Sequence, residues 1–123
     1  MSLKDYPSEK SKIIFGNGGG FTGLVNRYVL LENGQIFIEN NITNESKQLK
    51  VLKKKDTKNL FKNIQALQME KRTLNEVGNT YQFLEFSQKG KSLKYQWQNL
   101  KDKPEFEDVD KMYQQLIEKV KVN

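Results

Sequence analysis

Short apolar runs separated by turn-forming residues dominate the first half of the chain. They are rich in β-branched and aromatic side chains, a composition that predicts β-strands. Asn33-Gly34 predicts a type I′ turn between two of these runs, because Asn and Gly tolerate the positive φ that both central residues of that turn need. The first half is therefore expected to form antiparallel strands. The predicted strands are residues 12–15, 24–31 and 35–39, and residues 48–52 are a candidate for a further short strand.

Two segments place apolar residues at the spacing of an amphipathic helix. Residues 57–68 carry such a stripe directly after Asp56, which is a good N-cap residue. A second helix of about 15 residues follows Pro104, with acidic residues near its start and lysines near its end, as the helix dipole favours. Between the two helices, residues 80–87 and 93–97 are strand-like and flank a turn. The apolar stripes are Leu60, Phe61, Ile64 and Leu67 in the first helix and Phe106, Val109, Tyr113, Leu116, Ile117 and Val120 in the second.

This order of elements predicts an α+β fold. We expect an antiparallel sheet of four to five strands with two helices packed on one face and water on the other (β-β-β-α-β-β-α). The length of 123 residues predicts a single domain over residues 12–123, preceded by a flexible N-terminal arm, residues 1–11. The expected core comprises Ile14, Leu60, Phe61, Ile64, Leu67, Leu84 or Phe83, Leu93, Tyr95, Trp97, Tyr113, Leu116 and Ile117.

The chain contains neither Cys nor His. This excludes disulfides, thiol nucleophiles, histidine bases and nearly all zinc and copper sites. Acidic residues 105–110 complement the dipole at the start of the second helix and lack the spacing of a calcium loop. We therefore predict a non-enzymatic protein with no catalytic residue, no metal and no cofactor. The apolar runs are also too short for a transmembrane segment.

The net charge is +6, and lysine supplies 19 of the 21 basic residues. Proteins that read nucleic acids favour arginine, whose planar fork grips phosphates and base edges, so no specific nucleic-acid binding is expected. An alternative function stays open, because lysines beside aromatic residues on adjacent strands can bind a polyanion or single-stranded nucleic acid. The competing interpretation is cross-strand core packing. The residues concerned are Tyr81, Phe83, Tyr95 and Trp97, with Lys89 and Lys94.

Residues 16–23 hold five glycines in eight positions. We predict a loop here, since glycine favours turns and costs conformational entropy to order. No helix is expected directly after it and no GxxxxGK[ST] motif is present, which argues against a phosphate loop. The segment is either a turn or bulge joining two strands, or a recognition loop on which Phe21 anchors a partner. The candidate binding residues are Asn17, Gly18, Gly19, Gly20, Phe21 and Thr22.

The segment Gly19-Gly20-Phe21-Thr22-Gly23 resembles the GGFAG segment of emfourin-type bacterial protease inhibitors, which are likewise small α+β domains. Thr22 stands where that motif has Ala. The wider pattern of paired strands and helices resembles small domains of bacterial envelope lipoproteins. These resemblances imply a protein partner reached through residues 16–23, in the narrower case a protease. They also imply a periplasmic or cell-envelope location rather than a cytoplasmic one. The identity of the partner and the oligomeric state stay open.

Overall fold

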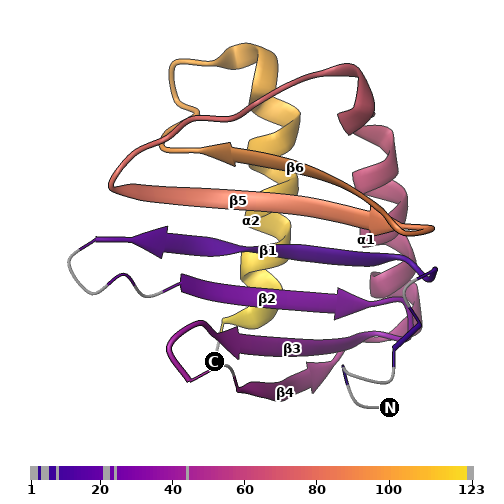
Figure 1. Cartoon of the computed structure of the whole chain (residues 1–123). Coiled ribbons are helices and arrows are strands. Elements are labelled where there is room, and N and C mark those ends of the chain that lie inside the picture. The colour runs from indigo at the N-terminus through magenta and orange to yellow at the C-terminus, as the bar shows by residue number, and fades with distance from the viewer. Residues whose placement is uncertain are drawn as a thin grey trace.

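A computed structural model describes residues 3, 6, 7, 9–20, 23, 25–43 and 45–121. Within them, one six-stranded antiparallel sheet carries two helices on one face (Figure 1). The α+β class is confirmed, and the sheet has more strands than the four to five predicted. The elements are β1 (Lys12–Gly19), β2 (Val25–Leu31), β3 (Gln35–Asn40), β4 (Ser46–Val51), α1 (Lys54–Ala66), β5 (Thr80–Gln88), β6 (Lys91–Trp97) and α2 (Glu107–Val120).

The first strand occupies the middle of the sheet. The strand order is β4-β3-β2-β1-β5-β6, so β1 pairs with β2 on one side and with β5 on the other. Strands β1 to β4 follow one another as a meander, and α1 then carries the chain to the other side of β1. Because β1 has two partners, any feature of its sequence affects both halves of the sheet.

Strand β4 lies at one margin of the sheet. All six of its residues are exposed, so apolar burial does not hold this strand in place. It is held by backbone pairing with β3 and by a hydrogen bond from Gln35 Nε2 to Gln48 Oε1 at 2.8 Å, and the ladder contains a register shift between Ile36 and Phe37. The shift leaves Leu49 as the extra residue of a β-bulge, a feature typical of sheet edges.

The main core lies between the sheet and the two helices. Trp97 is 1% exposed and meets the Tyr113 ring edge-on at 5.3 Å, which confirms the prediction that the Trp97 face packs on the helices. Leu93 was wrongly assigned to this core, because it lies near the β5–β6 turn and is 36% exposed. Phe61 and Ile117 are partly buried around it. Its buried members include Ile13, Phe15, Leu30, Ile36, Leu60, Ile64, Leu67, Leu84, Tyr95, Trp97, Val109, Met112, Tyr113 and Leu116.

A second apolar cluster lies on the face away from the helices, where we expected water. It consists of Ile14, Val29, Leu31, Phe37 and Phe83, each 6% exposed or less. Leu3 and Tyr6, from the predicted N-terminal arm, pack against it. Ile14 therefore belongs to the core, but to this layer rather than to the one beneath the helices. The sheet buries apolar side chains on both faces.

The predicted type I′ turn at Asn33-Gly34 differs in the structure. Residues 32–34 join β2 to β3, and Gly34 has a positive φ of 94° while Asn33 does not. This is a three-residue hairpin loop rather than a type I′ turn. The type I′ pattern occurs instead between β5 and β6, where Lys89 and Gly90 have φ of 50° and 76°.

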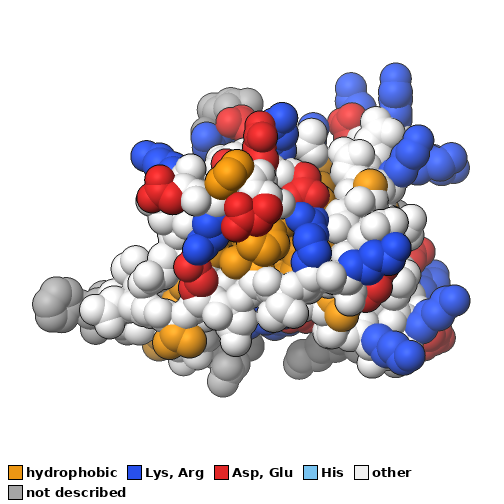
Figure 2. All heavy atoms as spheres, turned by 90° about the horizontal axis from the view of Figure 1, so that it is seen from above, with side chains coloured by type: hydrophobic (Ala, Val, Ile, Leu, Met, Phe, Trp, Pro, Cys, Tyr) orange, Lys and Arg blue, Asp and Glu red, His pale blue; other side chains and the backbone are white. Residues whose placement is uncertain are grey.

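The start of each helix is charged. Asp56 does not cap α1, because the N-cap position is Lys53 and Asp56 lies within the first turn. Helix α2 begins with Glu107, Asp108 and Asp110 in its first turn, as predicted from the helix dipole. Figure 2 looks down on this end of the molecule and shows acidic and basic side chains interspersed near its centre.

Candidate binding site at the glycine-rich end of the sheet

The glycine-rich segment is largely a strand and not the predicted loop, since β1 continues through Gly19. The reason is close backbone approach on both sides. A Cβ atom added to Gly16 would lie 1.8 Å from the carbonyl oxygen of Asn26, and one added to Gly19 would lie 1.8 Å from that of Asn79. Glycine therefore lets the central strand fit between its two neighbours.

The predicted site residues divide at the end of this strand. Asn17, Gly18 and Gly19 belong to β1, and Gly20 follows with its N–H donating to the carbonyl oxygen of Asn79 at 2.7 Å. Phe21 and Thr22 lie outside the described residues, so the choice between an exposed anchor and a core position for Phe21 stays a prediction.

Polar side chains form a row across four strands at this end. In register, Asn17 of β1 lies between Asn26 of β2 and Gln82 of β5, and Gln82 lies opposite Trp97 of β6. Asn26 Nδ2 donates to Asn17 Oδ1 at 3.2 Å, and Trp97 Nε1 donates to Gln82 Oε1 at 2.8 Å. The indole is only a donor, so it fixes Gln82 Oε1 as the acceptor and directs the Gln82 amide hydrogens elsewhere.

A hollow of about 390 Å³ opens beside this row. It is lined by residues 17–19, Asn26, residues 80–82 and Gln98. None of these residues carries a charge at neutral pH, and four of them are carboxamides. Each carboxamide can donate and accept hydrogen bonds. We refer to these lining residues together with Gly20 as the glycine end. Its chemistry suits an uncharged ligand that both donates and accepts.

Tyr113 connects α2 to the glycine end. Its hydroxyl donates to the carbonyl oxygen of Gly16 at 2.9 Å, and its side chain is 2% exposed. Burial raises the pKa of Tyr113 to about 12, and a hydrogen bond with the Asn17 side chain opposes this rise. The phenol therefore stays protonated at neutral pH, and its hydrogen bond to Gly16 connects α2 to β1.

Sequence reasoning missed Asn26, Thr80, Gln82 and Gln98. A signal was present, because Asn26 and Gln82 are carboxamides within segments that the sequence predicts to be strands. Their meeting at Asn17 depends on the register of β1 with both neighbours. That register could not be predicted while residues 16–20 were taken as a loop.

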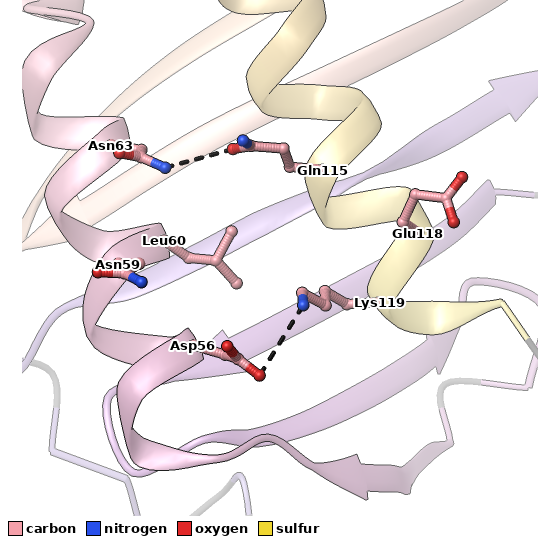
Figure 3. A pocket seen from close by; sticks show the side chains of 7 residues that line it. All are labelled: Asp56, Asn59, Leu60, Asn63, Gln115, Glu118 and Lys119. Carbon is pink, nitrogen blue, oxygen red and sulfur yellow. Dashed lines mark hydrogen bonds and ion pairs between the residues drawn. The ribbon is translucent and has the colours of Figure 1, made fainter.

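A second hollow, of about 510 Å³, lies between α1 and α2 (Figure 3). Leu60 lies between the helices there, and polar side chains bridge them. Asn63 Nδ2 donates to Gln115 Oε1 at 3.3 Å, and Lys119 Nζ lies 3.9 Å from Asp56 Oδ2. These groups face one another across the helix pair, as the close view shows, so we interpret them as a connection between the helices.

The proposed aromatic platform is divided between the two faces of the sheet. Tyr95 and Trp97 are buried beneath the helices, whereas Phe83 and Tyr81 belong to the opposite layer. Lys94 Nζ lies 5.2 Å from the centre of the Phe83 ring. The four rings therefore present no common surface on which bases could stack.

Within the described part of the chain, no group of three or more acidic side chains is placed to hold a metal ion. The described helices are also too short or too polar to cross a membrane. A comparison of the chain with protein-family models finds no match, and neither does a comparison with curated protein sequences.

Proposed function

We propose that this chain is a non-enzymatic protein-binding module that engages a partner through the glycine end. The observation that carries the proposal is the row of carboxamides around the hollow. One uncharged hollow at the end of β1, where the strand finishes in two glycines, is lined by the carboxamides of Asn17, Asn26, Gln82 and Gln98. Tyr81 supplies the lining's one titratable group, so the hollow lacks the paired base and nucleophile that hydrolysis needs.

The chemistry of the lining favours polypeptide main chain as the ligand. A peptide group presents one donor and one acceptor, and a carboxamide side chain presents the same pair. Gly20 follows the strand without a side chain, and a Cβ placed there would meet nothing within 4 Å, so another backbone can approach closely at this point. An extended segment of a partner protein meets both requirements.

The resemblance to emfourin-type inhibitors narrows this proposal to a protease as partner. Under that narrower form, Phe21, which follows Gly20 in the sequence, supplies an apolar anchor. An inhibition assay against a panel of bacterial proteases tests it, with Phe21→Ala as the variant that should lose inhibition. Failure of this assay removes the protease and leaves the broader proposal to the next experiment.

Peptide selection tests the broader proposal. A displayed random-peptide library is selected on the folded protein, and enriched peptides are measured by calorimetry. Thr80→Lys and Gln98→Glu each add a charge at the hollow, and both residues are exposed, so the fold should tolerate the changes. We expect each variant to weaken peptide binding about tenfold or more, because an unpaired charge must be desolvated.

Gln114→Glu on the exposed side of α2 is the matched control for Gln98→Glu, since it makes the same change in charge at a residue that does not line the hollow. It should leave peptide affinity within about twofold. The proposal is wrong if no peptide is enriched, or if the control weakens binding as much as Gln98→Glu does. Selective binding to a glycan array instead of peptides would assign the hollow to carbohydrate and also overturn it.

A further inference from the structure

The positive charge of the molecule is concentrated in one stretch of chain. Residues 46–69 contain seven lysines and a single acidic residue, Asp56, so they account for the whole net charge of +6. The rest of the chain balances 14 basic residues against 14 acidic ones. The seven lysines are Lys47, Lys50, Lys53, Lys54, Lys55, Lys58 and Lys62.

These lysines are exposed and are not neutralised within the protein. All seven are exposed, and the ion pairs among the described residues involve none of them. Asp56 pairs instead with Lys119 of α2. The positive potential of β4 and α1 therefore faces solvent.

The placement of three of the lysines opposes local helix physics. Lys53 is the N-cap of α1, Lys54 and Lys55 open its first turn, and no side chain caps the helix. The dipole favours negative charge at a helix N-terminus, so three cations there destabilise the helix. Departures from local preference that bring no internal gain are typical of functional surfaces.

Apolar side chains project from the same margin. Ile42, Leu49 and Val51 are 65%, 40% and 57% exposed, and all three belong to the β3–β4 hairpin. Leu49 and Val51 alternate with lysines along the chain, and Leu49 is the bulged residue of β4. Exposed aliphatic side chains among lysines contribute nothing to the stability of the sheet, but they match the boundary between lipid headgroups and acyl chains.

We propose that this margin binds the surface of an anionic lipid bilayer. The β4 margin consists of Ile42, the β4 residues Lys47 to Val51, and Lys53 to Lys55. Its lysines contact acidic headgroups while its aliphatic side chains reach the headgroup–acyl boundary. Insertion stays shallow, because the outer backbone groups of an edge strand cannot leave water unpaired. The opposite end of the molecule, with the acidic start of α2, faces away from the membrane (Figure 1).

The same residues argue against nucleic acid as the ligand of this margin. Both arginines of the chain lie elsewhere and are engaged, Arg27 with Glu39 and Arg72 with Asp108. Phe61, the one aromatic residue in the basic stretch, is partly buried and meets the Phe86 ring. Base stacking needs an exposed ring, whereas a charged lipid surface needs only point charges and aliphatic contacts. This inference is independent of the function proposed for the glycine end.

Vesicle sedimentation tests the inference. The probes are phosphatidylcholine vesicles with about 30 mol% phosphatidylglycerol and vesicles of phosphatidylcholine alone. We expect binding to the anionic vesicles only, weakened about tenfold or more when salt rises from about 50 to about 300 mM. Lys50→Gln with Lys54→Gln should weaken binding about tenfold or more. Leu49→Ser with Val51→Thr should weaken it at least about threefold and leave its salt dependence intact.

The matched control is Lys89→Gln with Lys91→Gln, which removes the same charge at the β5–β6 turn. It should change binding less than about threefold. All the exchanged side chains are exposed, and equal melting temperatures establish that the variants are folded. The inference is overturned if anionic vesicles do not bind at low salt, or if the control loses as much as the test pair. It also fails if the Leu49 and Val51 changes have no effect, or if a single-stranded oligonucleotide binds more tightly than the vesicles.

Discussion

At the scale of single residues, Tyr113 couples the protonation of one phenol to the stability of the fold. Its pKa is raised to about 12 in the folded protein, against about 10 when unfolded. Above pH 10 the unfolded phenol loses its proton while the folded one keeps it. The stability that this group contributes is therefore present below pH 10 and is lost as pH rises toward 12. The full loss amounts to about 2–3 kcal/mol.

Urea unfolding between pH 8 and 12 measures this effect. Tyr113→Phe removes the titration and also the hydrogen bond to Gly16, so we expect it to be less stable than the wild type at pH 8 by about 1 kcal/mol. As pH rises past 10, the wild type should lose stability faster than the variant. Parallel pH profiles for the two proteins would show that Tyr113 titrates normally. Burial also raises the pKa of Tyr95, which acts in the same direction in both proteins.

The hydrogen bond from Trp97 to Gln82 supports a second prediction. Gln82→Met leaves the buried indole N–H without its acceptor, so the free energy of unfolding should fall by about 1–3 kcal/mol. In a Trp97→Phe background the same change should be nearly neutral, because no donor remains. Equal costs in both backgrounds would assign the effect to packing of the Gln82 side chain instead. Chemical unfolding of the four proteins completes the cycle.

At the scale of elements, two glycines of hairpin loops differ in a testable way. Gly34 and Gly90 both have positive φ, but a Cβ on Gly34 would lie 2.6 Å from the carbonyl oxygen of Leu52, whereas one on Gly90 meets nothing within 4 Å. Gly90→Ala should therefore cost about 1 kcal/mol through backbone strain alone. Gly34→Ala should cost about 2–4 kcal/mol, since the β2–β3 loop and Leu52 must separate. Thermal unfolding compares them, and equal costs would contradict this contact.

Most helices and strands could be predicted from the sequence, whereas the extent of β1 and one turn type could not. Periodicity identified both helices and the strands at β2, β3, β5 and β6, because apolar burial repeats with the period of each element. Periodicity could not place the end of β1, because the glycines there suggested a loop. In the structure these glycines belong to the strand, since the backbone of Asn26 and Asn79 comes too close to leave room for a Cβ atom. Turn preference located a hairpin at Asn33-Gly34 but assigned the type I′ geometry to the wrong hairpin. Lys89 adopts positive φ because the two-residue connection between β5 and β6 imposes it.

At the scale of the whole molecule, the unexpected feature is a sheet that is buried on both faces. The alternation in β1 was too short to be interpreted, because Ile13, Ile14 and Phe15 are consecutive apolar residues. In the structure they alternate between the helix layer and the opposite cluster. A continuous apolar run is typical of a strand buried on both faces, and β1 is the central strand. The candidate binding residues were predicted only in part because the position of β1 in the sheet was not predicted. Asn17 meets Asn26 and Gln82 only because β1 lies between β2 and β5.

Tyr6 links the start of the chain to this second apolar layer. It packs against the cluster that contains Ile14 and Leu31, its hydroxyl donates to the carbonyl oxygen of Ser11 at 2.6 Å, and it accepts from the N–H of Glu32 at 3.2 Å. Tyr6→Ala removes both the ring and the hydrogen bonds, so the free energy of unfolding should fall by about 2–4 kcal/mol. Tyr6→Phe keeps the ring and should cost only about 1 kcal/mol.

A hydrophobic dye and urea unfolding together distinguish the two contributions. If Tyr6 covers the apolar cluster, the Tyr6→Ala protein should bind the dye in its folded state and the Tyr6→Phe protein should not, because only the first uncovers apolar surface. Tyr81→Phe is a suitable control, since Tyr81 borders the same cluster and the change keeps its ring. If Tyr6→Ala proves as stable as the wild type and binds no dye, residues 1–11 do not help to close this face. The arm would then be the independent segment that its polar sequence predicts.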